Sequence, residues 1–506
     1  MIKFIDSVLD RITMYRLVLY YLIFLLGVAL ILSIFGALPY DPFALLVMVG
    51  FSIAACWITN TLFARVFRVP ANVESVFISA LILPLIITPL ASPNDLWFLG
   101  WACVLAMASK YVVTIHKKHL FNPVALAVAI TYLTIDQTAS WWVGNAPMLA
   151  FVLIGGLLVV RKIRRFGLVL SFIGAALATT LVFSVIGHDS LIRAMQQTLL
   201  YSPLFFFAFV IVTEPLTTPP TRRLQMIYGA IVGVFFAPQI HFGALYMTPE
   251  LAVLVGNVFS YLVSPKSKLI LTLKQKIQVA PDIWDFIFEP DRRVAFASGQ
   301  YMEWTLGHDD PDSRGNRRYF TIASAPTERD IRLGVKFYQN SSSFKQSLLE
   351  MDADTEIVAA QLAGDFTLPR DPRKKLVFIA GGIGITPYRS MLKYLLDTHQ
   401  RRYITVFYAN KTLNDIVYKD VLDRAQQQLG VKTVYMCTDI SRLPSTWKGR
   451  VGYISPEVIR EEVPDYRRCI FYISGPNALV TSVRETLRKM GIKPDHIKTD
   501  FFSGLA

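Results

Sequence analysis

The chain has 506 residues, of which 53% are hydrophobic, and its formal net charge is +14. That length predicts more than one domain. The basic excess does not indicate nucleic-acid binding, because many basic residues lie in short loops between apolar segments, and the four cysteines have no spacing typical of a metal site or an iron–sulfur cluster.

The first half of the chain, residues 1–265, consists of apolar segments with charged residues only between them. A membrane-spanning helix needs about 20 mostly apolar residues, and ten segments approach that length, the fifth and sixth being short. We therefore expect a polytopic α-helical membrane domain of about ten helices. These predicted helices lie near residues 17–36, 43–63, 74–91, 96–114, 121–135, 147–160, 166–186, 198–214, 224–239 and 249–264.

Basic residues predict the orientation of these helices, because they are retained on the cytoplasmic side. Alternate loops are basic, as in Arg65 with Arg68 and in RKIRR (161–165), whereas the loops between them share a single basic residue, Arg193. This alternation predicts a multi-pass protein of the cell inner membrane with both termini and the second half of the chain in the cytoplasm.

Beyond residue 265 charged residues are frequent and apolar runs shorten to the length of strands. In residues 266–370 such runs are separated by Pro, Gly, Asp and Asn, which predicts an antiparallel β-barrel. In residues 371–506 strands alternate with helices, which predicts a doubly wound α/β domain. Ligands on such sheets bind beyond the carboxyl ends of the strands.

One such strand end reads FIAGGIGITP (378–387). Gly381, Gly382 and Gly384 would let the backbone approach a bulky ligand, and the helix start that follows favours a phosphate. Pro387 suits the first turn of that helix. A tight strand-to-helix turn without a ligand explains the glycines equally well.

Two further stretches hold polar side chains. RRYFTIAS (317–324) is a strand in which neighbouring side chains point to opposite faces. NSSSFKQSLLE (340–350) places serines at a helix start, where hydroxyls and free N–H groups could hold a pyrophosphate. Each has a plainer interpretation, a solvated basic strand and an ordinary helix cap.

Together and in this order, these stretches resemble the motifs of the ferredoxin–NADP reductase superfamily over residues 266–506, along with GQY (299–301), ISGPNAL and DFF (500–502). The resemblance implies a soluble ferredoxin reductase-like module with FAD on the β-barrel and NAD(P)H on the α/β domain. It implies catalytic roles for Tyr319, Thr321, Ser474 and Phe502. It implies cofactor-binding roles for Arg318, Tyr319, Phe320, Thr321, Ser324, Lys336, Ser341, Ser342, Ser343, Gly381, Gly382, Gly384, Thr386, Pro387, Gly475 and Pro476.

Within that resemblance, Arg318 and the three serines would hold the FAD pyrophosphate, Tyr319 would lie against the flavin, and Thr321 would hydrogen-bond near its N5. The sequence departs from the family pattern in two places. Ser474 stands where the family usually has Cys, and the chain continues past the aromatic pair as SGLA, which leaves open which Phe shields the flavin. The choice between NADH and NADPH also stays open.

The membrane half has a resemblance of its own. HLFNPVALAVA (119–129), VTEPLTTPPT (212–221) and IYGAIVG (227–233) resemble the large membrane subunit of the Rnf and Na⁺-translocating NADH:quinone reductase complexes. The resemblance implies a bound FMN or riboflavin, but the Ser/Thr-Gly-Ala-Thr motif for covalent FMN is absent and Thr138 is a poor substitute. We expect a non-covalent flavin, with Asn122 and Glu214 as its candidate binding residues; a helix break and a polar turn are the plainer interpretations.

These expectations combine into a membrane-bound NAD(P)H dehydrogenase that passes electrons through FAD to a quinone or an extracytoplasmic flavoprotein. Membrane lipid and other electron-transport subunits are the expected partners, and no nucleic acid or metal is expected. Haem is not expected, because the histidines of the membrane half lie near helix ends. Two alternatives stay open: a redox-driven Na⁺ or H⁺ pump component, and a transporter whose soluble domain senses NAD(P)H.

Overall fold

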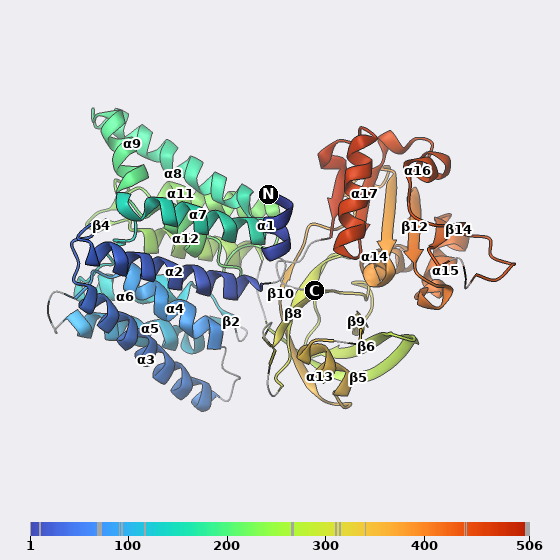
Figure 1. The fold of residues 1–506 in the computed structure, drawn as a ribbon, viewed down its shortest axis with the longest axis horizontal. Helices are drawn as coiled ribbons and strands as arrows, with labels where there is room; N and C mark the ends of the chain where they lie inside the picture. The colour runs from blue at the N-terminus through green and yellow to red at the C-terminus, as the bar shows by residue number, and fades with distance from the viewer. Residues whose placement is uncertain are drawn as a thin grey trace. The chain divides into compact units, whose positions relative to one another are not determined.

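The computed structural model describes the whole chain except residues 1, 10–11, 68–72, 91, 93–94, 116–117, 265–267, 309–310, 313–314, 340, 440, 442 and 501–506 (Figure 1). The described residues form two compact units, one ending at Lys268 and the other beginning at Leu269. We describe each unit by itself.

The first unit is a bundle of helices with two short hairpins, and each of the ten predicted segments contains helix (Figure 1). The short amphipathic helix α1 was not predicted. The helices are α1 (Ile2–Leu9), α2 (Met14–Ile34), α3 (Pro42–Phe67), α4 (Val73–Ile86), α5 (Asp95–Val112), α6 (Pro123–Ile135), α7 (Ala146–Ile163), α8 (Phe166–Ile186), α9 (Leu191–Leu200), α10 (Leu204–Phe206), the π-helix η1 (Phe207–Ile211), α11 (Arg222–Phe235) and α12 (Pro249–Val263). The hairpins are β1 (Thr114–Ile115) with β2 (Lys118–His119), and β3 (His241–Phe242) with β4 (Leu245–Tyr246).

Fewer helices than predicted have the length of a membrane span. Among the described residues, four helices (α2, α3, α7 and α8) are long and apolar enough to cross a membrane. The predicted segment 198–214 is broken, since α9 and the α10–η1 helix form a pair bent by 54° that would count as a fifth span. The apolar helices α4, α6 and α12 are shorter. Helix α6, for example, has 13 residues, about 20 Å of rise against a hydrocarbon core of about 30 Å.

Helices α8 and α11 pack closely through glycine. A Cβ added to Gly229 would lie 2.6 Å from the backbone oxygen of Leu168, and one added to Gly233 would lie 2.4 Å from that of Phe172. Small residues of this kind let helix backbones approach each other, which replaces the hydrophobic driving force that lipid does not supply. The backbones of α8 and α11 are therefore in close contact at these two glycines.

The second unit begins with a six-stranded antiparallel sheet. Its strand order is β8-β7-β10-β5-β6-β9, with a helix, α13 (Ser343–Glu350), packed on it through Phe344 and Leu348. Within the described residues β8 and β9 are the edge strands, and just beyond β8 the Ala323 N–H donates to the Arg332 carbonyl of β9 at 2.9 Å, so the ends of the two edge strands meet. The strands are β5 (Leu269–Ala280), β6 (Ile283–Pro290), β7 (Tyr301–Thr305), β8 (Arg317–Thr321), β9 (Ile331–Lys336) and β10 (Glu356–Ala363).

The unit ends with a parallel sheet of order β14-β13-β12-β11-β15-β16. Helices α14 and α15 pack in one hydrophobic core and α16 and α17 in another, which is the doubly wound arrangement that the sequence predicts. The elements are β11 (Leu376–Gly381), η2 (Gly382–Ile385), α14 (Thr386–Asp397), β12 (Ile404–Asn410), η3 (Leu413–Asp415), α15 (Lys419–Leu429), β13 (Lys432–Cys437), β14 (Arg450–Val451), α16 (Pro456–Glu462), η5 (Tyr466–Arg468), β15 (Ile470–Ser474), α17 (Asn477–Lys489), η6 (Pro494–His496) and β16 (Ile497–Thr499).

Candidate functional site

A cavity of about 720 Å³ lies between the two sheets of the second unit. Its walls come from the end of β8, from β9, and from the carboxyl ends of β11, β12, β13 and β15, where ligands of doubly wound sheets bind. The volume falls within the range of small-molecule and cofactor sites. Eleven of the predicted site residues line it: Tyr319, Phe320, Thr321, Lys336, Gly381, Gly382, Gly384, Thr386, Ser474, Gly475 and Pro476.

Three side chains from distant parts of the chain meet in this cavity. The Asp500 Oδ2 atom accepts hydrogen bonds from Thr321 Oγ1 at 3.3 Å and from Ser474 Oγ at 3.1 Å. Thr321 and Ser474 are almost fully buried. The sequence singled out both hydroxyls but not Asp500, although it is the first residue of the DFF motif; Phe502 of that motif lies outside the described residues.

In the turn after β11, Gly382 and Gly384 are glycine for different reasons. Gly382 has a φ of +52°, where a side chain is strained, but a Cβ there would meet nothing within 4 Å. At Gly384 a Cβ would lie 2.5 Å from the backbone oxygen of Ser474. Gly384 is therefore needed for contact with the loop after β15, whereas Gly382 leaves open space beside the cavity. Pro387 is in the first turn of α14, as predicted.

A second polar cluster lies at the N-terminus of α13. The buried Arg318 guanidinium donates from Nη2 to Asp312 Oδ1 at 3.3 Å, and the Ser343 N–H donates to Asp312 Oδ2 at 3.3 Å. Ser342 caps the helix, accepting from the Lys345 N–H, and the Ser341 hydroxyl donates to the Tyr338 carbonyl. The structure thus brings Arg318 and a predicted serine together around an anion, here a carboxylate.

The remaining predicted residues have identifiable partners. The Tyr319 hydroxyl donates to Glu303 Oε2 at 2.6 Å, directly across the strand pair. Lys336 pairs with Asp415 at 3.1 Å beside the cavity. Burial opposes ionisation of Asp415, but hydrogen bonds from Lys336 and Thr412 lower its pKa overall. Ser324 does not line the cavity: its hydroxyl accepts from the Arg332 N–H and its carbonyl accepts from Ser390.

The first unit brings its two predicted site residues together. Asn122 Nδ2 donates to Glu214 Oε2 at 2.9 Å, and Thr217 Oγ1 donates to the same oxygen at 2.9 Å. The Asn122 N–H donates to Asn257 Oδ1 at 2.8 Å, and Asn257 Nδ2 donates to the Tyr228 hydroxyl at 3.1 Å. This polar chain joins the start of α6 to α11, α12 and the loop that follows η1.

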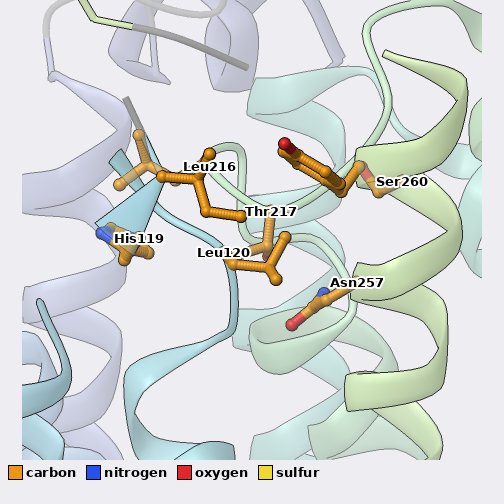
Figure 2. Close-up of a pocket in the computed structure, with 8 residues that line it drawn as sticks. His119, Leu120, Leu216, Thr217, Asn257 and Ser260 are labelled. Carbon is orange, nitrogen blue, oxygen red and sulfur yellow. The ribbon is translucent and has the colours of Figure 1, made fainter. Parts of the chain in front are cut away.

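A small cavity of about 10 Å³, room for one water-sized group, lies beside this chain. Figure 2 shows His119 on one side of it, Asn257 and Ser260 of α12 on the other, and Leu120, Leu216 and Thr217 between them. His119 Nε2 is 3.9 Å from Glu214 Oε1, and the buried Ser260 Oγ has no hydrogen-bond partner among the described residues. Thr138 lies apart from this cluster in the sequence, exposed between α6 and α7.

Comparison with known families matches both halves of the chain. Residues 378–485 match the oxidoreductase NAD-binding domain, and residues 138–267 match the NQR2, RnfD, RnfE family. The predicted combination of a reductase module with a membrane region of this family is therefore confirmed.

Individual relatives cover less than half of the chain. It is 26% identical to a flavohemoprotein of Bacillus cereus over 46% of this chain, and 24% identical to the glycine betaine monooxygenase reductase subunit of Chromohalobacter salexigens over 45%. The matches span 60% and 62% of those relatives. Among solved structures, the flavohem-like FAD/NAD-binding domain of nitric oxide dioxygenase from Vibrio cholerae has 19% identity and a TM-score of 0.41, over 46% of this chain and 98% of that chain.

These findings define the class of the two halves. The C-terminal half contains an oxidoreductase NAD-binding domain and is similar in sequence to reductase proteins. It is joined to a membrane region related to NQR2, RnfD and RnfE.

Proposed function

We propose that the chain is a membrane-bound NAD(P)H dehydrogenase that passes electrons through FAD into the membrane, to a quinone or an extracytoplasmic flavoprotein. The observation that supports this most directly is the cavity in which Thr321, Ser474 and Asp500 converge between the two sheets. When bound there, FAD accepts a hydride and releases single electrons.

The residues that line the cavity and the cluster of Arg318 and Ser343 at the start of α13 have distinct roles in this proposal. Arg318 and the Ser343 N–H hold the FAD pyrophosphate, and Tyr319 presents its ring to the flavin. Gly382 and the loop at Ser474 receive the dinucleotide. The Asp500 carboxylate accepts from the hydroxyls of Thr321 and Ser474 and so holds both of them in place beside the cavity.

The orientation in the membrane is also part of the proposal. The alternating basic loops support a multi-pass inner-membrane protein with both termini and the reductase module in the cytoplasm. The hydrocarbon core is about 30 Å thick, which is too wide for one efficient electron step. Delivery to the far side therefore needs a carrier within the membrane region.

For that carrier we propose a non-covalent FMN or riboflavin at Asn122 and Glu214. The adjacent cavity of about 10 Å³ takes only a water-sized group, so this proposal requires the surrounding segments to move apart when the flavin binds. The N-terminus of the short helix α6, the loop that follows the π-helix η1 and the Glu214 carboxylate meet there, and π-helices often lie at functional sites. Other electron-transport subunits are candidate partners of this face.

A second candidate function, a redox-driven Na⁺ or H⁺ pump component, rests on the same carboxylate. Glu214 Oε1 lies 3.9 Å from His119 Nε2, and His119 lines the small cavity that the buried Ser260 hydroxyl also borders. Ionisable groups inside membrane proteins often mark ion or proton paths. Generation of a Na⁺ or H⁺ gradient in proteoliposomes, driven by NAD(P)H, would favour this alternative over simple electron delivery.

The test uses the full chain purified in detergent. We expect rapid NAD(P)H oxidation with ferricyanide, quinone reduction, and release of FAD plus a second flavin on acid precipitation, with no flavin fluorescence on the denatured polypeptide. Arg318→Ala should lose FAD and NAD(P)H oxidation, because the guanidinium fork suits a pyrophosphate, whereas Arg329→Ala, at an exposed position in the turn before β9, should keep both. Binding of NAD(P)H without turnover would instead indicate a transporter with a sensing domain.

A further inference from the structure

The anion position at the start of α13 is filled by the chain itself. Both carboxylate oxygens of Asp312 are engaged there, Oδ1 by Arg318 Nη2 and Oδ2 by the Ser343 N–H, each at 3.3 Å. The Asp312 N–H in turn donates to Ser343 Oγ at 2.9 Å. The same side chains are those proposed above for the FAD pyrophosphate.

The charges between Arg318 and the N-terminus of α13 favour the binding of one anion and oppose the binding of a second. A helix N-terminus attracts negative charge through its free N–H groups, and the Arg318 side chain is only 2% exposed, so its charge is shielded little by water. A pyrophosphate placed against the same donors would meet the Asp312 carboxylate at close range, and like charges at that distance repel strongly. Asp312 and a pyrophosphate therefore cannot occupy the site together.

The arginine does not depend on Asp312 for its place. Arg318 Nη1 donates to the carbonyl oxygens of Gly315 at 2.9 Å and Arg317 at 2.7 Å. The guanidinium also lies over the Phe344 ring, 5.3 Å from its centroid. On the helix side, the Ser343 hydroxyl has a further partner in His308 Nε2 at 3.0 Å. When the Asp312 carboxylate moves away, the Arg318 guanidinium and the Ser343 N–H therefore keep their positions and can bind another anion.

We propose that Asp312 is an internal competitor for the FAD pyrophosphate and sets how tightly the chain holds FAD. The proposal rests on the assignment of Arg318 and Ser343 to that pyrophosphate. In the free protein Asp312 neutralises Arg318; FAD binding displaces the carboxylate, and FAD release restores it. Asp312 thus lowers the affinity of the chain for FAD and lets bound FAD exchange with free FAD.

The decisive variant is Asp312→Asn, which keeps the size of the side chain and removes its charge. We expect FAD to leave this variant about tenfold more slowly than the wild type, as judged by the recovery of flavin fluorescence after dilution, because the charged competitor is gone. In the flavin-stripped full chain, inorganic pyrophosphate should raise the melting temperature of Asp312→Asn more than that of the wild type. Asp352→Asn removes the same charge from an exposed position beyond α13 and should match the wild type in both measurements.

The outcomes separate this proposal from the assignment on which it rests. If Arg318→Ala loses FAD but Asp312→Asn releases FAD at the wild-type rate or faster, Asp312 is no competitor and the FAD assignment stands. If Arg318→Ala keeps full FAD occupancy, the assignment of the pyrophosphate site fails and the competition fails with it. Circular dichroism of each variant reports whether the unit is folded, and Asp312→Ala gives a second neutral variant for the same comparison.

Discussion

Asn122 Nδ2 donates a hydrogen bond to Glu214 Oε2 at 2.9 Å and so joins two side chains that are 92 positions apart in the sequence. The same asparagine caps α6, since its Oδ1 accepts from the Ala125 N–H at 3.0 Å. One side chain thus fixes the start of a short helix and the position of a carboxylate within the membrane region. This is the arrangement on which the proposed flavin site depends.

Replacement of Asn122 by Ala tests that dependence. The variant loses a helix cap, which costs about 1 kcal/mol, and leaves Glu214 without one of its donors, which costs about 1–3 kcal/mol more. We expect a lower melting temperature in detergent and loss of the second flavin with FAD retained. Asn145→Ala is the matched control, because Asn145 caps α7 in the same way, through the Met148 N–H at 2.9 Å. Equal flavin content in the two variants would argue against a site at Asn122.

The contact between α8 and α11 supplies a second prediction. Gly229→Ala and Gly233→Ala should each lower the melting temperature markedly, because the new methyl group would press against the backbone of α8. Gly174→Ala, on α8 itself, should be neutral or slightly stabilising, since a Cβ there meets nothing within 4 Å and alanine favours helix. The measurement is thermal unfolding of the three variants in one detergent. Equal melting temperatures would show that α8 and α11 can move apart without loss of stability.

The sequence predicted the local elements better than their long-range contacts. Hydropathy located all ten helical segments, but it could not show that the segment 198–214 breaks near Pro203, because the residues on both sides of the break are apolar. Asp500 was missed as a site residue because its bond to Thr321 spans 179 positions, and no local pattern encodes such a contact. Asp312 lies in a stretch rich in Asp, Pro and Gly, which reads as an ordinary turn until the fold brings it to Arg318.

The glycine turn gives a third prediction, in which two neighbouring glycines behave differently. Gly384→Ala should destabilise the second unit by several kcal/mol, because its Cβ would overlap the Ser474 carbonyl. Gly382→Ala has room and should cost only about 1–2 kcal/mol for its positive φ. The new methyl group borders the cavity, so the KM for NAD(P)H should rise with FAD retained. Unchanged KM in a folded Gly382→Ala protein would mean that the turn receives no dinucleotide.

Acid sensitivity of the second unit is the fourth prediction. Glu328 pairs with the buried Arg389 through two hydrogen bonds, at 2.5 and 3.0 Å. Burial opposes ionisation of Glu328, but the bonds from Arg389 outweigh it and hold the pKa below the usual 4.5. A lowered folded-state pKa gives stability that is fully present above the unfolded value and is lost as the pH falls through the folded one. Stability contributed by this pair should therefore decline below about pH 4.5.

The variant Glu328→Gln isolates that contribution. At pH 7 it should be less stable than the wild type, because Arg389 is left buried without its partner, and the difference should shrink as the pH falls below 4.5. Melting temperatures across this pH range provide the measurement, with the exposed Glu356→Gln on β10 as the charge-matched control. A constant difference at all pH values would show that the pair does not titrate in this window.

Asp500 is the subject of the last prediction. Its Oδ2 accepts from the hydroxyls of both Thr321 and Ser474. Asp500→Asn would place there either a neutral amide oxygen, which is a weaker acceptor for both hydroxyls, or an amide NH₂ group, which accepts from neither. We expect hydride transfer from NAD(P)H, followed as flavin bleaching in a stopped-flow instrument, to slow by about 10-fold to 100-fold, while FAD content and NAD(P)H affinity change little. Asp495→Asn, which replaces an exposed carboxylate in η6, provides the control and should react at the wild-type rate.

Thr321→Val and Ser474→Ala should each produce part of the Asp500→Asn effect, since each removes one of the two hydrogen bonds. If Asp500→Asn instead releases FAD or unfolds at lower temperature with no change in the bleaching rate per bound flavin, the carboxylate holds the sheets together and takes no part in placing the reacting groups.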